Sequence, residues 1–96
     1  MIVIEWLGGE ATDEAMAAVT REVASWGDEL DPDGRARLRL EIHATETHYA
    51  VHLADDDAGA YGTGARALDR SLRHALSAAI ARFRRGSEEL ARVLAA

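Results

Sequence analysis

Apolar and polar residues alternate in two neighbouring runs, residues 35–44 and residues 47–53. A period of two places successive side chains on opposite faces of a β-strand. With a tight turn at Thr45-Glu46, the two runs predict an antiparallel hairpin with three apolar pairs, Ile42 with Tyr49, Leu40 with Val51 and Leu38 with Leu53. The other face of the hairpin is polar and carries Arg35, Arg37, Arg39, Glu41, His43, His48 and His52.

Two other segments have the three-to-four-residue period of an α-helix. In the first, Thr12 is a suitable N-cap, and the apolar face consists of Met16, Val19, Val23, Trp26 and Leu30. The second is expected to begin near Gly64, and its apolar face consists of Leu68, Leu72, Ala75, Leu76, Ala79, Ile80 and Phe83. Gly86 is a suitable C-cap, and Ser87 then begins a short C-terminal helix.

The remaining segments complete the order of elements. Residues 2–7 are largely apolar and rich in β-branched residues, and two glycines end them, which predicts a strand. Residues 31–34, Asp-Pro-Asp-Gly, have the composition of a turn. Residues 58–63 form either a short fourth strand or a loop. The order β-α-β-β-(β)-α predicts an α+β fold, in which two helices pack on one face of a small antiparallel sheet and a short C-terminal helix follows.

Length and composition indicate a single domain over residues 1–96. The absence of cysteine excludes disulfides, thiolate zinc sites and thiol nucleophiles. No apolar run is long enough to cross a bilayer, and the first residues lack the basic region of a signal peptide. We therefore expect a cytoplasmic protein that has no contact with a membrane.

Charge is unevenly distributed along the chain. The whole protein has a formal net charge of −6, and residues 1–34 hold nine acids and one arginine. The stretch from residue 66 to residue 85 has the opposite sign, with one acid and six arginines, Arg66, Arg70, Arg73, Arg82, Arg84 and Arg85. A positive surface of this kind attracts a polyanion or an acidic partner.

Two interpretations of the arginine-rich stretch stay open. If it is one helix, Arg66, Arg70, Arg73 and Arg84 share the face opposite the apolar one, with no glutamates among them to form ion pairs. Such a face is either simply solvated, or it binds an anion, for which phosphate contacts are the natural use. The anion is a nucleic acid, the acidic first helix of the same chain, or that helix in a second copy.

Other candidate sites are less well supported. In the predicted register His43 lies opposite His48, with His52 one pair further along, and two imidazoles at this spacing are able to share a metal ion. Arginines on the same face disfavour a cation, so exposed histidines are the simpler interpretation. Residues 55–57, three aspartates, lack the spacing of a calcium-binding loop, and the glycines of residues 59–64 match no nucleotide-binding motif. No catalytic arrangement and no cofactor site are evident, so we do not expect an enzyme.

The order of elements resembles that of the ribosome hibernation-promoting factor / protein Y family, whose short members are β-α-β-β-β-α proteins of about this length. The resemblance covers the initial strand, a helix opened by residues 11–15, the alternating hairpin, and a final helix with residues 67–69 near its start and residues 82–85, Arg-Phe-Arg-Arg, at a basic end. Two features differ from the family pattern. The first helix is acidic where members usually have a basic one, and the fourth strand and the aromatic residue usual just before the second helix are reduced to residues 58–64.

The resemblance implies a protein that docks on the small ribosomal subunit. In that family, basic residues of both helices contact ribosomal RNA in the channel where messenger and transfer RNA bind. By resemblance, Arg66, Arg70, Arg73, Arg82, Arg84 and Arg85 have this role here. Arg37 and Arg39 join them if the polar face of the sheet also contacts RNA.

Three functional hypotheses follow. The first is a non-enzymatic, ribosome-associated factor of the hibernation or stress-response type, which binds small-subunit ribosomal RNA through its arginine-rich second helix and inhibits translation. The alternative is a protein–protein interaction module without nucleic-acid binding, which forms a homodimer or docks a charged partner. The third, an enzyme or metal-dependent site built on His43, His48 and His52, has the least support.

Overall fold

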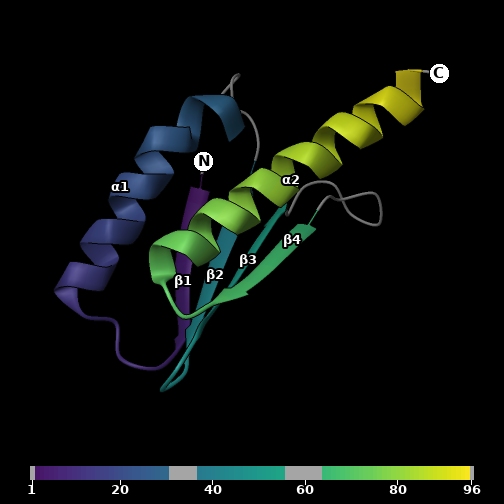
Figure 1. Cartoon of the computed structure of the whole chain (residues 1–96). Helices are drawn as coiled ribbons and strands as arrows, with labels where there is room; N and C mark the ends of the chain where they lie inside the picture. The colour runs from purple at the N-terminus through teal and green to yellow at the C-terminus, as the bar shows by residue number, and fades with distance from the viewer. Residues whose placement is uncertain (1, 31–36, 56–63, 96) are drawn as a thin grey trace.

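The computed structural model describes residues 2–30, 37–55 and 64–95, and it is a four-stranded sheet with two helices (Figure 1). Along the chain the elements are β1 (Ile2–Gly8), α1 (Asp13–Leu30), β2 (Leu38–Ala44), β3 (Tyr49–Asp55), β4 (Gly64–Asp69) and α2 (Leu72–Ala95). The α+β class and the order of elements predicted from the sequence are confirmed.

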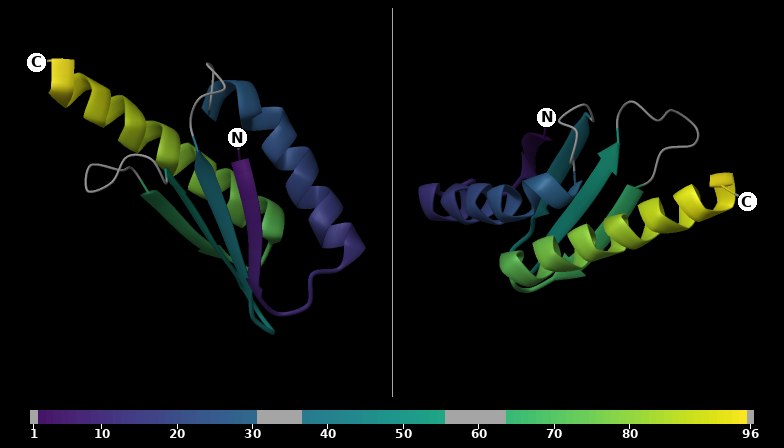
Figure 2. Two further views of the ribbon diagram at one scale, coloured as in Figure 1. Left: turned by 180° about the vertical axis from the view of Figure 1, so that it is seen from behind. Right: turned by 90° about the horizontal axis from the view of Figure 1, so that it is seen from above.

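The strands follow one another across the sheet in the order β1-β2-β3-β4. The pairs β2–β3 and β3–β4 are antiparallel, but β1 runs parallel to β2. The sheet is therefore mixed rather than wholly antiparallel, because α1 carries the chain back to the end of the sheet at which β1 began. Both helices lie on the same face of the sheet, and the other face is left open (Figure 2).

The hairpin of β2 and β3 has the predicted faces but a different register. Ile42 pairs with Val51 and Leu40 with Leu53, so the register is shifted by two residues from the predicted one. The shift arises because the turn spans four residues: the Thr45 amide donates to the His48 carbonyl at 2.8 Å, and the His48 amide donates to Thr45 Oγ1 at 3.0 Å. A shift of two leaves each side chain on its predicted face, because the period of a strand is two.

The segment before α2 is a strand, which corrects the predicted start of the second helix near Gly64. Residues 64–69 pair with β3, and Leu68 is 67% exposed rather than part of the core. The helix begins only after a bend, at which Asp69 Oδ1 accepts the Ser71 amide at 2.8 Å and the Ser71 carbonyl accepts the Ala75 amide at 3.0 Å. The alternative fourth strand over residues 58–63 lies outside the described residues.

Helix α2 is longer than predicted at its other end. It continues through Gly86 and Ser87 to Ala95, so the predicted short C-terminal helix is the last part of α2. This part extends past the end of the sheet (Figure 1). Within the described part of the chain, neither helix combines the length and the apolar character that a membrane span requires.

The core lies between the sheet and the two helices. Its fully buried large side chains are Leu38, Leu40, Ile42, Val51 and Leu53 from β2 and β3, Val19 from α1, and Leu76 and Ile80 from α2. On α1 the predicted apolar positions Val23, Trp26 and Leu30 pack against this core, and the Ala15 amide donates to Thr12 Oγ1 at 3.1 Å, as predicted for an N-cap. The apolar faces of the predicted elements are thus the ones that fold together.

Two glycines give opposite predictions for alanine substitution. Gly9 has a φ of 77°, and a Cβ added there would lie 2.7 Å from the Cβ and the carbonyl oxygen of Ala44. We expect Gly9→Ala to lower the free energy of unfolding by about 1–3 kcal/mol. Gly27 is inside α1, and nothing lies within 4 Å of a Cβ added there. Gly27→Ala should therefore raise the free energy of unfolding by about 0.5–1 kcal/mol. Urea denaturation followed by circular dichroism measures both, and a stabilised Gly9→Ala variant would contradict the turn geometry.

Candidate functional site

Opposite charges collect at opposite edges of the sheet. Residues 2–30, which form β1 and α1, hold seven acids and one arginine, and residues 64–95, which form β4 and α2, hold seven arginines and three acids. Because β1 and β4 are the two outer strands, the negative and positive halves of the chain lie on opposite sides of the molecule. The molecule therefore has a negative and a positive side.

The bend between β4 and α2 divides the arginine-rich stretch. Arg66 lies on β4, Arg70 in the bend, and the other four arginines on α2. The prediction that Arg66, Arg70, Arg73 and Arg84 share one face of a single helix is therefore wrong. A continuous helix would have needed residues 64–69 to be helical, and they are paired with β3 instead.

Arg84 interacts with α1. Its Nη1 lies 2.9 Å from Glu29 Oε2, and its guanidinium carbon lies 5.4 Å from the centre of the Trp26 ring. Two turns further back, Glu22 Oε1 accepts hydrogen bonds from Trp26 Nε1 at 3.2 Å and from Ser77 Oγ at 3.3 Å. Two contacts thus join the helices, the ion pair of Arg84 with Glu29 and the hydrogen bond of Ser77 to Glu22. The first helix itself supplies the anion for Arg84.

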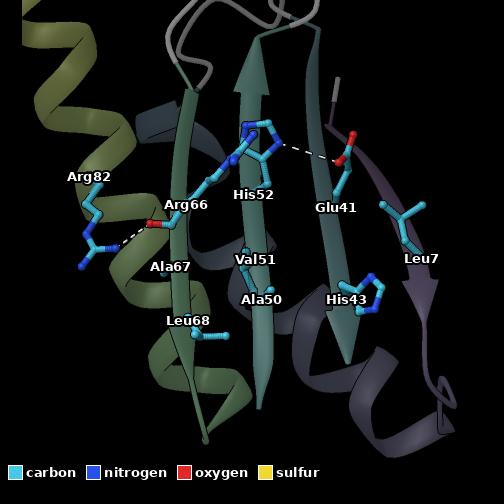
Figure 3. Close-up of a pocket in the computed structure, with 10 residues that line it drawn as sticks. All are labelled: Leu7, Glu41, His43, Ala50, Val51, His52, Arg66, Ala67, Leu68 and Arg82. Atoms are coloured by element: carbon cyan, nitrogen blue, oxygen red, sulfur yellow. Dashed lines mark hydrogen bonds and ion pairs between the residues drawn. The ribbon is translucent and has the colours of Figure 1, made fainter. Parts of the chain in front are cut away.

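Arg82 lies on another side of α2, next to the edge of the sheet. Its Nη1 donates to the backbone carbonyl of Arg66 on β4 (Figure 3). The outer edge of a sheet presents unpaired backbone groups that invite pairing with another chain. Arg82 satisfies one of these groups on β4 and so protects that edge.

Arg70, Arg73 and Arg85 are among the arginines that are exposed and form no ion pair within the described part of the chain. Arg73 also lines a shallow groove between the helices, whose other lining residues are Ala18, Arg21, Glu22 and Leu76. Arg21, which sequence reasoning did not single out, thus comes to the same groove as Arg73. Nothing in the sequence indicates this, because the flank of α1 that faces α2 is set by tertiary packing.

The open face of the sheet carries a broad hollow of about 670 Å³ (Figure 3). Small residues such as Ala50 lie in its middle, and two exposed leucines, Leu7 and Leu68, lie on the outer strands β1 and β4. The register places four polar side chains in one row across the four strands, Glu5, Glu41, His52 and Arg66. Within this row His52 Nδ1 lies 3.7 Å from Glu41 Oε2.

The histidines do not form the predicted pair. His43 lies opposite Ala50, whereas His48 belongs to the turn, where its Nδ1 lies 2.7 Å from Thr47 Oγ1. His52 lies between Glu41 and Arg66 in the register. The two-residue shift of the hairpin separates His43 from His48, and no group of three metal-ligating side chains occurs among the described residues.

The two predicted arginines of the hairpin lie near the start of β2. Arg37 is exposed and precedes the strand, and Arg39 lies on the open face, where its Nη1 is 3.2 Å from Glu5 Oε1. Neither is close in the chain or in the sheet to the arginines of α2, because β2 is separated from β4 by β3. The eight predicted arginines therefore do not form one surface.

Comparison with known proteins finds related structures but no related sequences. No protein-family model and no curated protein matches the chain. The crystal structure of the protein Y N-terminal domain from Thermus thermophilus is similar, with a TM-score of 0.65 and 20% identity over 97% of this chain and 99% of that one. A ribosomal subunit interface protein from Coxiella burnetii has a TM-score of 0.66 and 10% identity over 99% of this chain and 98% of that one. The resemblance inferred from the order of elements is thus confirmed for the fold, over nearly the whole chain.

The contacts of Arg84 predict that it stabilises the fold and that its neighbour Arg85 does not. Arg84→Ala removes the ion pair with Glu29 and the contact with Trp26, so we expect the free energy of unfolding to fall by about 1 kcal/mol. Arg85→Ala is the matched control on the same helix, with an expected change within about 0.5 kcal/mol. Equal effects of the two substitutions in urea denaturation would contradict the assignment of Arg84 to the helix interface.

Proposed function

We propose that this protein is a non-enzymatic, ribosome-associated factor that binds ribosomal RNA of the small subunit and inhibits translation. The observation that carries the proposal is the match of the whole fold to a protein Y domain and to a ribosomal subunit interface protein. The charge distribution supports it independently, because the exposed arginines of the β4–α2 side offer a surface for a polyanion.

Arg70, Arg73 and Arg85 are the principal RNA-binding residues in this proposal. They are exposed, and within the described residues no acid pairs with them, so their charge is available to phosphates. Twelve residues of helix separate Arg73 from Arg85, a distance of about 18 Å along the axis. Arg21, which lines the same groove as Arg73, lies at the margin of this surface and would add to its positive potential.

The acidic first helix is compatible with this surface because some of its acids already have partners. Glu29 pairs with Arg84, and Glu22 accepts hydrogen bonds from Trp26 and Ser77. Arg84 compensates the negative charge of Glu29, and Arg21 and Arg73 line the same groove as Glu22. Repulsion of phosphates by α1 is therefore weaker along the groove between the helices than its composition suggests.

The other predicted arginines have different roles in the proposal. Arg84 is held by Glu29, Arg39 lies next to Glu5, and Arg66 projects from the open face of the sheet. We expect these three to contribute less to RNA binding than Arg70, Arg73 and Arg85. Arg37, which is exposed before β2, is a peripheral residue in this arrangement.

Charge reversal tests the surface directly. In co-sedimentation with purified small ribosomal subunits, Arg70→Glu combined with Arg73→Glu should reduce affinity at least about tenfold. The slope of log affinity against log salt should also fall by about 0.7–0.9 for each phosphate that the variant no longer neutralises. The matched control is Arg66→Glu, which reverses an exposed arginine on the open face of the sheet, and it should change affinity less than about threefold.

The same variants separate RNA binding from inhibition. Wild-type protein and Arg66→Glu should inhibit a purified translation system in a dose-dependent manner, whereas the double variant should not. Wild-type protein that fails to co-sediment with small ribosomal subunits at low salt would overturn the ribosomal function. A double variant that binds as tightly as the wild type would overturn the assigned surface.

A further inference from the structure

We propose that the open face of the sheet binds the same face of a second copy of this chain, in a two-fold symmetric, face-to-face dimer. This inference does not depend on the proposed function, because it uses side chains on the face of the sheet that the helices leave uncovered (Figure 3). Three features of that face support it: its exposed leucines, the order of its charges, and the protection of the β4 edge.

The exposed leucines lie at the two ends of one row across the sheet. Leu68 on β4 pairs with Ala50, which pairs with His43 on β2, and Leu7 precedes the Gly8 that faces His43 on β1. Leu7 is 54% exposed and Leu68 is 67% exposed. Large exposed apolar side chains that flank a hollow with charged and polar side chains around it are typical of an interaction surface rather than of a solvated sheet face.

The charges of the neighbouring row run from negative to positive across the sheet. Glu5 on β1 and Glu41 on β2 are acidic, His52 follows on β3, and Arg66 on β4 is basic. Arg39 of the adjacent row lies 3.2 Å from Glu5 and offsets part of its charge. In a two-fold symmetric dimer, if residue i of the first copy contacts residue j of the second, then residue j of the first copy contacts residue i of the second. If the row of the second copy runs in the opposite direction across the sheet, the acidic end of each row therefore faces the basic end of the other.

One orientation of the two-fold axis uses this complementarity. An axis parallel to the strands, between the two faces, places β1 of one copy over β4 of the other. Glu5 then faces Arg66 of the second copy, and Leu7 faces Leu68 of the second copy. An axis in the same plane but perpendicular to the strands places each strand over itself, so that Glu5 faces Glu5 and Arg66 faces Arg66. Repulsion between like charges disfavours that second arrangement.

The β4 edge is partly blocked for the alternative of pairing strand to strand. Arg82 occupies the carbonyl of Arg66 at this edge. The face that remains is about 20 Å along the strands and about 20 Å across them, given a rise of about 3.3 Å per residue and strands about 4.8 Å apart. These dimensions give about 400 Å² per copy, less than the roughly 600–1,000 Å² per partner of stable complexes, so we expect a weak dimer that depends on protein concentration.

Complementary charge reversals test both the face and the orientation. Glu5→Arg alone would place two arginines opposite each other, and Arg66→Glu alone would place two glutamates opposite each other. Each variant should therefore be monomeric where the wild type dimerises. Mixed in equal amounts, the two variants restore both charge-complementary faces in a heterodimer. Sedimentation velocity from low micromolar to several hundred micromolar protein measures all three samples, and circular dichroism verifies that each variant is folded.

Matched controls distinguish this interface from general attraction between oppositely charged proteins. Glu14→Arg and Arg92→Glu reverse the same charges at exposed positions on the two helices, and each should dimerise like the wild type. Leu68→Ser, which removes an exposed apolar side chain from the face, should weaken the dimer at least about fivefold.

Several results would overturn the proposal. These are a wild type that stays monomeric at all concentrations, a mixture of Glu5→Arg and Arg66→Glu that stays monomeric, or a dimer unaffected by Leu68→Ser. A dimer that is abolished instead in Leu94→Ser would also overturn it, because Leu94 is exposed on the part of α2 that extends past the sheet. That result would assign the interface to the end of α2.

Discussion

The burial of one face of the sheet beneath two helices determines most other properties of this molecule. Every second side chain of β2 and β3 is apolar and is fully enclosed by α1 and α2, for example Leu40, Ile42, Val51 and Leu53. Burial of such side chains is the main favourable term in folding, at about 1.5–3 kcal/mol for each. Both helices of the described residues lie on the same face of the sheet, so neither of them covers the intervening side chains of the four strands.

The bend at residues 70 and 71 then distributes the arginine-rich stretch over two surfaces. Before the bend, Arg66 and Leu68 belong to β4 and project from the open face. After the bend, Arg73 and Arg85 belong to α2 and lie on the opposite, helical side of the molecule. A segment that looks uniform in sequence therefore contributes to two surfaces of different chemistry. The helical side has exposed cations without acidic partners, and the open face has apolar residues and charges of both signs.

The faces of the elements could be predicted from the sequence, but several of their pairings could not. Alternation along residues 38–44 identifies the buried side chains, yet a register shifted by two residues satisfies the same alternation, so Ile42 was expected opposite Tyr49 and lies opposite Val51. The strand Gly64–Asp69 is too short to separate a period of two from a period of 3.6. Its alanines and leucine also favour a helix locally, and only pairing with β3 settles its structure.

The candidate site was predictable in its charge and only partly in its geometry. The sequence indicates that the positive charge lies on the β4–α2 side, but the availability of each arginine depends on tertiary contacts. Arg84 is compensated because Glu29 faces it across the helix interface, and Arg21 comes close to Arg73 because of the way in which α1 lies beside α2. Neither fact has a local sequence signal, since both join residues more than 50 positions apart.

The central claim is that the helical side, and not the open sheet face, contacts the ribosome. Hydroxyl-radical footprinting of side chains, read by mass spectrometry with and without small ribosomal subunits, tests it most directly. The protein is kept dilute so that self-association does not contribute. We expect subunits to protect Arg70, Arg73 and Arg85 from labelling, whereas Leu7 and Leu68 stay as reactive as in the free protein. Protection of Leu7 and Leu68 together with unchanged labelling of the three arginines would contradict the claim.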